Sequence, residues 1–305
     1  MGRNSYFLLL SLLIATANIA LGGNFNQDFN ILFGGNNAKI QDGEGSMSLQ
    51  LDRVTGAGVV SKNEYLFGRF DMQIKLVPGN SAGTVTTFYM SSIGPNHDEI
   101  DLEFLGNLSG DPYLLSTNMY ANGIGGREVQ YYLWYDPTAD FHTYSIDWNA
   151  QRIMILVDNI PIRVIYNNQR IGVPFPTRQA MKIYITLWNG DDWATRWGQV
   201  KIDWRRAPFI ANFRNFNANA CVPNGRATNC KNFNAGMNKG LNAADLKKMQ
   251  EIRSKWVVYD YCHDFRRYSH GLPNECRIRR KGNSNSLQKV HKSSNSHQKV
   301  HKSKA

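Results

Sequence analysis

The stretch HDEIDLEFLGN, residues 97–107, carries an acidic side chain at every second position of its centre. The acids and the apolar residues between them are Glu99, Ile100, Asp101, Leu102, Glu103 and Phe104. A period of two is typical of a β-strand with one wet and one buried face, so the three carboxylates lie on one side. Glu99 and Glu103 are separated by about 13 Å of extended backbone, and their side chains can lean toward each other across Asp101.

Paired carboxylates of this kind fit the chemistry of retaining glycosidases, which need two carboxyl groups about 5–5.5 Å apart. On its own, the Glu-x-Asp-x-Glu spacing is usually a solvated polar face or a calcium-binding edge. Crowding favours catalysis, because three like charges on one face repel each other. That repulsion can raise the pKa of one carboxyl so that it keeps its proton as a general acid.

The stretch HDEIDLEFLGNLSG, residues 97–110, resembles the active-site signature of plant xyloglucan endotransglucosylase/hydrolases, a branch of glycoside hydrolase family sixteen. Further stretches resemble that family in its order: NEYLFG (63–68), LVPGNSAGTV (76–85), FHTYS (141–145), GVPFP (172–176) and DDWAT (191–195). The resemblance runs from about Phe25 to Cys276. It implies a retaining enzyme that cleaves the β-1,4-glucan backbone of xyloglucan and transfers it to another xyloglucan chain. Glu99 is then the nucleophile, Glu103 the acid/base and Asp101 an assisting residue.

Two rival functions stay open at this level. A predominant xyloglucan endohydrolase uses the same intermediate, because water and a sugar hydroxyl compete for it. A catalytically silent glucan-binding lectin on the same scaffold is the other rival, although all three acidic positions are filled. We expect no metal and no organic cofactor, xyloglucan donors and xyloglucan or oligosaccharide acceptors as partners, and a monomer.

The first 22 residues have the features of a secretory signal peptide. Arg3 precedes an apolar run at residues 7–15, and the small residues at 20–22 suit a signal peptidase. The run is too short to span a bilayer comfortably. We therefore expect secretion to the cell wall and apoplast, with no membrane-bound state.

Short strands dominate residues 49–203. Residues 70–76 alternate strictly, residues 153–157 and 160–165 flank Asp158-Asn159 as a hairpin, and residues 181–188 form another strand. Many short strands separated by Gly, Pro, Asn and Asp favour an all-β sandwich of jelly-roll type. The family resemblance implies a concave groove for a polymer. We expect the jelly-roll domain at residues 23–215 and a disulfide-containing C-terminal extension at 216–280.

Four of the seven tryptophans fall within seventeen residues: Trp188, Trp193, Trp197 and Trp204. A tryptophan offers a flat face with a donor at its rim, which suits the faces of glucose rings. Core packing is the alternative, and for Trp204 the two interpretations are balanced. By resemblance, Asp192 and Trp193 line acceptor subsites.

Other binding positions come from the resemblance alone: Ser116, Thr117, Asn118, Arg127, Glu128 and Arg267. The sequence departs from the family pattern at three positions. Ser116 stands where His or Gln is common, Leu102 replaces a frequent Phe, and Trp197 stands where Gly is expected. An indole at 197 adds a stacking platform or narrows the acceptor side, so we include Trp197 among the candidate substrate-binding residues.

The four cysteines lie in the last third of the chain, and an even number in a secreted protein indicates disulfides. Three pairings are possible. Order and spacing favour Cys221 with Cys230 and Cys262 with Cys276, and the resemblance implies the same. A zinc site is the alternative, but no Cys-x-x-Cys or paired-histidine spacing supports it.

Asn107-Leu108-Ser109 is an N-glycosylation sequon that directly follows the acidic stretch. A glycan on Asn107 would lie beside the cleft.

A helix is expected at residues 242–256, with Asn242 as N-cap and Leu246, Met249, Ile252 and Trp256 at helical spacing. Residues 257–262 then read as a strand. By resemblance, this extension lengthens the acceptor groove and brings Arg267 near sugar.

The basic character of the chain comes from its end. Of a formal charge of +11, nine Lys and Arg residues with no acid lie in residues 277–305. Residues 284–293 repeat as 294–303 with one change, Leu287 to His297. We expect residues 281–305 to be disordered. They either reflect a tolerated duplication or tether the enzyme to acidic wall polysaccharide, and nucleic acid is not an expected partner.

Overall fold

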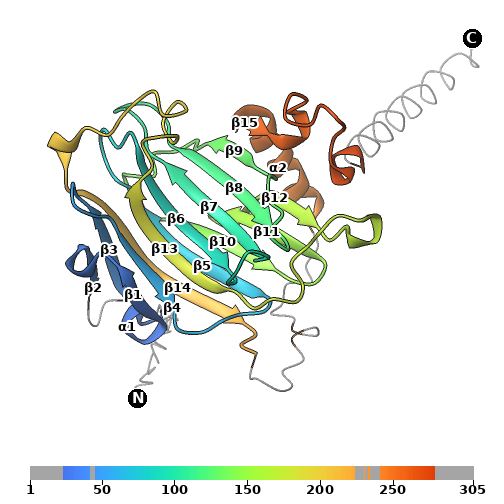
Figure 1. Ribbon diagram of the computed structural model, residues 1–305, viewed down its shortest axis with the longest axis horizontal. Coiled ribbons are helices and arrows are strands. Elements are labelled where there is room, and N and C mark those ends of the chain that lie inside the picture. The colour runs from blue at the N-terminus through green and yellow to red at the C-terminus, as the bar shows by residue number, and fades with distance from the viewer. Residues whose placement is uncertain (1–22, 42–44, 224–229, 231–232, 234–240, 279–305) are drawn as a thin grey trace, which may run out of the picture.

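The computed structural model describes residues 23–41, 45–223, 230, 233 and 241–278 of the chain. The expected signal peptide (1–22) and basic tail (281–305) lie outside the described residues. Two antiparallel sheets pack face to face, with the C-terminal extension at one end (Figure 1). The expected all-β sandwich with a small C-terminal helix and strand is confirmed.

The first sheet has eight strands. In spatial order they are β1 (Phe29–Phe33), β4 (Ala57–Ser61), β13 (Lys182–Asn189), β6 (Thr84–Ser91), β7 (Glu99–Leu105), β8 (Leu114–Tyr120), β9 (Val129–Tyr132) and β15 (Val257–Asp260). The second sheet has seven strands: β12 (Ile160–Tyr166), β11 (Arg152–Val157), β10 (His142–Trp148), β5 (Gly68–Lys75), β14 (Phe209–Ala220), β3 (Ser46–Leu51) and β2 (Ala38–Gln41).

The core lies between the sheets and follows the period of two along each strand. On β7, Ile100, Leu102 and Phe104 are completely buried, as the acidic stretch predicted. The ring of Phe104 meets Tyr144 of β10 edge-on, with 4.6 Å between the ring centroids. The contact ties β7 to the second sheet and leaves the acidic face of β7 directed away from the core.

The expected hairpin joins β11 and β12. Asp158 and Asn159 have φ angles of +49° and +62°. A turn with two left-handed residues matches the right-handed twist of the flanking strands, and Asp and Asn tolerate that conformation better than most residues. The Asp158 carboxylate also accepts a hydrogen bond of 2.8 Å from the backbone N–H of Thr143.

Helix α2 (Ala243–Trp256) begins at a capping box formed by Asn242 and Asp245. The helix packs on the second sheet, where Met249 lies against the buried side chains of Met154, Leu156 and Val164. Ile252 joins the main core, but Leu246 is 40% exposed, so the expected apolar stripe is shorter than its spacing predicted. None of the helices in the described ranges combines the length and apolar character needed to cross a bilayer.

Other, short helices are α1 (Phe25–Asp28) and the 3-10 helices η1 (Gly35–Asn37), η2 (Gln169–Ile171), η3 (Trp204–Arg206) and η5 (Tyr261–His263). The favoured disulfide pairing is confirmed, because Cys221 bonds Cys230 and Cys262 bonds Cys276. β15 pairs with β9 at the edge of the first sheet, and the second disulfide links two parts of the C-terminal extension that follows β15.

The packing of Phe104 generates a stability prediction. Phe104→Ala should lower the free energy of unfolding by about 3–5 kcal/mol, because it removes a buried ring and leaves a cavity between the sheets. Urea denaturation followed by tryptophan fluorescence measures the loss. The matched control is Val54→Ala at a side chain that is 91% exposed, which should change stability by less than about 0.5 kcal/mol. Equal effects of the two changes would contradict this account of the core.

Candidate active site

A groove crosses the face of the first sheet that is turned away from the core. It is a cavity of about 580 Å³. Its lining comes from five strands and from residues next to them: Phe33, Thr87, Tyr89, Glu99, Asp101, Glu103, Asn118, Tyr120, Glu128, Thr186, Trp188 and Trp193. The groove therefore runs across the strands from β1 to the start of β9, with the three acids of β7 in its floor.

Strand register brings aromatic and polar neighbours to each acid. Asp101 lies opposite Tyr89 of β6 and Asn118 of β8. Partners directly opposite each other in an antiparallel pair share a face of the sheet. The acids therefore face the groove among uncharged groups on both neighbouring strands. All three line the groove, so they share one face of β7, as expected from the sequence.

Glu103 has the electrostatics of a general acid. Its pKa is raised from 4.5 to about 7, first by burial and then by the negative charges of Glu128 and Glu99. The carboxyl therefore keeps its proton in mildly acidic solution and can give it up near neutrality. Repulsion along the strand was the cause expected from the sequence. Burial contributes more to the raised pKa, and the stronger repulsion comes from Glu128, which directly precedes β9.

Asp101 also has a pKa well above its usual range. Burial is the largest cause, followed by the charges of Glu99 and Glu103 and a hydrogen bond with Glu99, while the buried cation of Arg163 acts in the opposite direction. Asp101 thus keeps a proton that it can donate to the Glu99 carboxylate. This arrangement suits Glu99 as the nucleophile, because a hydrogen-bond donor orients it and steadies its charge.

His97 lies beside Glu99, two residues before the start of β7. Its Nδ1 lies 3.1 Å from the Gly94 carbonyl oxygen, an acceptor, so this nitrogen carries the proton. The ring stacks on Tyr120, and Nε2 lies 3.9 Å from a carboxylate oxygen of Glu99. A protonated His97 would therefore place a positive charge beside Glu99.

Four of the residues suggested by resemblance lie near the acids. Asn118 and Glu128 line the groove. Arg267, from the C-terminal extension, donates from Nη1 to Oε2 of Glu128 at 3.1 Å. Ser116 pairs with Glu103 in register but is buried, so it lies under the groove beside that acid.

Two of the expected binding residues point elsewhere. Thr117 pairs in register with Leu102, so its side chain lies on the core face, where its hydroxyl donates to the Val129 carbonyl at 2.9 Å. The Arg127 guanidinium is nearly buried and pairs with Glu275 at 2.8 Å. Because side chains alternate along β8, Thr117 cannot face the groove. The ion pair with Glu275 holds the Arg127 side chain at the junction with the C-terminal extension. Both are corrections to the sequence analysis.

Thr195 holds the loop that carries Trp193 and Trp197 against the end of β7. The buried Thr195 hydroxyl accepts from the Gly83 N–H and donates to the Gly106 carbonyl, both at 2.8 Å. This places Trp193 at the groove, 6.1 Å from Trp188 between ring centroids. The Asp192 side chain is 94% exposed and pairs with Lys201 at 3.1 Å, so it stands at the rim.

Beyond the end of β7, a second cavity of about 550 Å³ adjoins the groove at Trp193. Its walls include Asn107, Tyr132, Val258 and Trp197. Trp197 is 79% exposed, which agrees with a surface platform and not with core packing. Trp204, in contrast, is partly buried against the core and meets Phe209 edge-on, so its core interpretation is correct.

Asn107 borders this second cavity. Its Nδ2 donates to the Pro112 carbonyl at 3.0 Å and its Oδ1 accepts from the Leu108 N–H. An amide nitrogen carries two hydrogens, so one is left for attachment of a sugar. Glycosylation of Asn107 stays a prediction.

Several groove residues escaped the sequence analysis, among them Phe33, Thr87, Tyr89, Tyr120 and Thr186. Tyr89 stacks on Tyr184 with 4.9 Å between centroids. Alternation along residues 84–91 and 114–120 separates their two faces, but only the register with β7 shows which face meets the acids.

The family model described as glycosyl hydrolases family 16 matches residues 25–206, which is more than half of the chain and includes all three acids. The chain belongs to glycosyl hydrolase family 16. A second model, described as xyloglucan endo-transglycosylase (XET) C-terminus, matches residues 230–276 and so covers the extension.

Members of the family with close sequences match nearly the whole chain. Xyloglucan endotransglucosylase protein 1 of Diospyros kaki is 53% identical over 275 residues, covering 90% of this chain and 95% of its own. Xyloglucan endotransglucosylase/hydrolase 2 of Glycine max is 52% identical over 278 residues, covering 90% and 97%. A prokaryotic β-1,3-1,4-glucanase from a mouse hindgut metagenome shares the fold, with a TM-score of 0.53 and 23% identity over 66% of this chain and 99% of its own.

Within the part of the chain that the structure describes, no group of three or more His, Cys, Asp and Glu side chains is arranged to hold a metal ion.

The raised pKa of Glu103 predicts how stability depends on pH. The folded protein holds this proton more tightly than the unfolded chain, so the contribution is fully present below pH 4.5 and is lost as pH rises through about 7. From this group alone, the free energy of unfolding should fall on the order of 3 kcal/mol across that window. Glu103→Gln removes the titration, so the variant should gain stability relative to wild type as pH rises.

Urea denaturation of wild type and Glu103→Gln at pH 4.5 and pH 8 tests this expectation. Because the other titrating groups are shared, the difference between the two proteins isolates Glu103. A difference that stays constant between the two pH values would contradict the assignment of a raised pKa.

Proposed function

We propose that this family 16 protein is a secreted xyloglucan endotransglucosylase that remodels the plant cell wall by cutting a xyloglucan chain and joining it to another. The observation that carries the proposal is the division of labour among three acids in one groove. Glu103 and Asp101 hold protons, and Glu99 accepts a hydrogen bond from Asp101. The matched XET C-terminus and the names of the relatives point to xyloglucan as the glucan.

The first step forms a covalent intermediate. The Glu99 carboxylate attacks the anomeric carbon of the donor, and the bond from that carbon to the leaving O4 breaks as Glu103 gives its proton to the oxygen. The leaving chain departs with a new hydroxyl, and the donor remains as a glycosyl ester of Glu99. Asp101 moves no proton to substrate in this step, and its hydrogen bond orients the nucleophile.

The second step reverses the proton transfer. Glu103, now a carboxylate, takes the proton from the O4 hydroxyl of an acceptor chain while that oxygen attacks the anomeric carbon. The ester bond breaks, and Glu99 is released as a carboxylate. One glycosidic bond is lost and one is formed, so no water is consumed.

The second cavity, beyond the Glu103 end of β7, supports a sugar over water as the acceptor of the glycosyl group. The second cavity is lined by exposed apolar faces, including Trp193 and Trp197, and the extension contributes Val258 to the same wall. Aromatic faces of this kind stack on sugar rings. A chain held there would compete with water for the glycosyl ester, which separates the proposal from the hydrolase alternative.

The test mixes the secreted protein with xyloglucan and a fluorescently tagged xyloglucan oligosaccharide. Label should enter the polymer without a matching increase in reducing ends. New reducing ends without label in the polymer would favour the hydrolase. Neither product, with xyloglucan still bound, would favour the lectin and overturn the enzyme assignment.

Loss of either catalytic carboxylate should abolish turnover. Glu99→Ala removes the nucleophile, and Glu103→Ala removes the proton donor, so each should reduce transfer by at least about three orders of magnitude. Near-UV circular dichroism checks that the fold is intact. Near-normal rates in either variant would remove the corresponding role.

A further proposal concerns the basic tail, residues 281–305. We propose that its six Lys residues hold the enzyme on acidic wall polysaccharide, with the three His residues of the tail adding charge in a mildly acidic wall. Retention of wild type on pectin should fall with salt, and deletion of residues 281–305 should abolish that salt-dependent part. Equal retention of both proteins at low salt would contradict the tether.

A further inference from the structure

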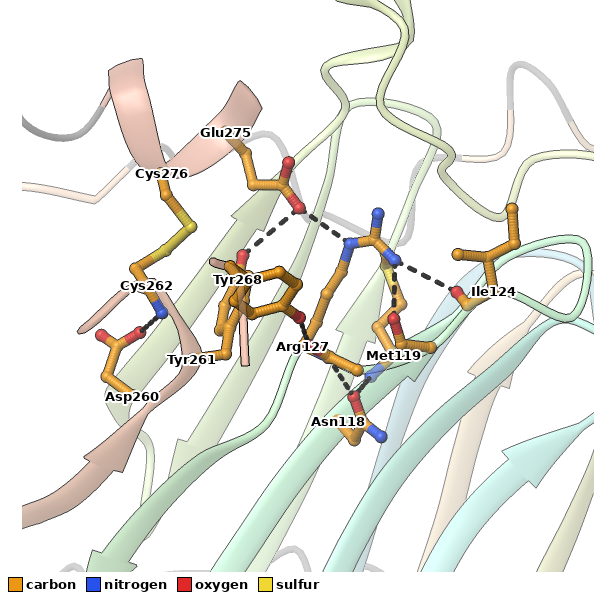
Figure 2. Close-up of polar contacts among 12 residues, drawn as sticks. Asn118, Met119, Ile124, Arg127, Asp260, Tyr261, Cys262, Tyr268, Glu275 and Cys276 are labelled. Carbon is orange, nitrogen blue, oxygen red and sulfur yellow. Dashed lines mark hydrogen bonds and ion pairs between the residues drawn. A yellow bond between two sulfur atoms is a disulfide. The ribbon is translucent and has the colours of Figure 1, made fainter. Parts of the chain in front are cut away.

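Glu275, near the end of the extension, forms an ion pair with Arg127 at the junction with the first sheet (Figure 2). Arg127 donates from Nε to Oε1 of Glu275 at 2.8 Å, and the two side chains are only 9% and 13% exposed. The Tyr261 hydroxyl lies 3.4 Å from the same carboxylate oxygen. Burial and a directional hydrogen bond make this pair far better defined than a surface ion pair.

Arg127 is also held through its main chain. Its N–H donates to Oδ1 of Asn118 at 2.9 Å, and its carbonyl accepts from the buried guanidinium of Arg163. Its Nη1 donates to the Ile124 carbonyl at 3.1 Å. The main-chain N–H and carbonyl of Arg127 and two of its three guanidinium nitrogens therefore have partners, and the next residue along the chain is Glu128 of the groove.

The extension grips the same segment at several points. The Tyr261 N–H donates to the Glu128 carbonyl at 3.1 Å, and the Tyr268 hydroxyl donates to the Gly126 carbonyl at 2.6 Å. The Cys262–Cys276 disulfide joins the residues that directly follow Tyr261 and Glu275 (Figure 2). The bond fixes Tyr261 and Glu275 relative to each other, so the extension acts as one body on residues 126–128.

We propose that Glu275 is a positioning residue: by pairing with Arg127 it holds Glu128 in the groove beside Glu103, so that the C-terminal extension governs proton transfer at the catalytic strand. The inference rests on the proposed function and deepens it, because it gives the extension a part in the acid–base step as well as in acceptor binding.

The charged groups around Glu103 determine how the position of Glu128 affects the pKa of Glu103. The titratable and charged groups around it are Glu99 and Asp101 on its own strand, Tyr89 on β6, Tyr120 on β8, Glu128 before β9 with Arg267 paired to it, Arg163 from the second sheet beneath Asp101, and His97 beside Glu99. Of these groups, Glu128 is the one that directly follows Arg127 in the chain, so its position depends on how Arg127 is held.

Loss of the Glu275 charge should lower the pKa of Glu103. The segment at residues 126–128 then loses one of the contacts that fix it, so Glu128 can move away from Glu103. Glu103 then feels less repulsion and loses its proton at a lower pH. The alkaline limb of kcat/KM for donor cleavage reports this acid in the free enzyme.

The experiment measures kcat/KM for donor cleavage from pH 4.5 to 8.5 in wild type, Glu275→Gln, Glu128→Gln and the double variant. Glu275→Gln should move the alkaline limb to lower pH, and each unit of movement reduces the rate above the limb tenfold. Glu128→Gln should move it the same way. The double variant should move no further than Glu128→Gln, because Glu275 acts through Glu128.

The matched control is Glu251→Gln on α2, whose exposed carboxylate lies 4.0 Å from Lys248 and touches none of this network. Its pH profile should equal that of wild type. If Glu275→Gln folds poorly, Arg127→Met with Glu275→Met removes both partners without leaving a buried charge, and it should show the same shift.

An unmoved limb in folded Glu275→Gln or in the double-Met variant, beside a moved limb in Glu128→Gln, would overturn the inference. Independent shifts that add in the Glu275→Gln, Glu128→Gln protein would do so as well. Wild-type transfer from xyloglucan to a labelled oligosaccharide establishes the proposed function separately, so the two ideas fail by different results.

Discussion

The packing of Ile100, Leu102 and Phe104 into the core is the constraint on which the catalytic arrangement depends. A strand has two faces, so three apolar residues buried between the sheets force the three acids between them onto the opposite face. The core contact of Phe104 with Tyr144 and the proton chemistry of Glu103 are thus consequences of one alternation. A shift of register by one residue would exchange the two sets and destroy both.

Placing the acids in the centre of an eight-stranded sheet gives them an environment that an edge strand would not provide. Aromatic neighbours on β6 and β8 limit their contact with water, and burial is the main cause of the raised pKa values of Asp101 and Glu103. Burial of ionisable groups opposes folding at neutral pH, and the packed sandwich beneath β7 offsets that cost. The C-terminal extension adds a second layer of control, because it holds Arg127 and pairs Arg267 with Glu128 at the far end of the groove.

Local pattern predicted most of the elements that position the site. The alternation at residues 97–107, the Asp158-Asn159 turn and the Asn242 cap each depend on near neighbours in sequence, so they could be predicted from sequence alone. Tertiary partners could not. The faces of Thr117 and Tyr89 depend on strand register, and the burial of Arg127 depends on Glu275, which lies 148 residues further along the chain. The strong influence of Glu128 on Glu103 has the same origin, since it crosses from the start of β9 to β7.

The most direct test of the account is to trap the intermediate on the proposed nucleophile. A xyloglucan oligosaccharide bearing fluorine at C2 and a fluoride leaving group at the anomeric carbon forms the glycosyl ester quickly and loses it slowly. After digestion, tandem mass spectrometry should find one glycosyl unit attached to Glu99. Attachment to Asp101 or Glu103, or an unmodified protein that still turns over xyloglucan, would contradict the mechanism.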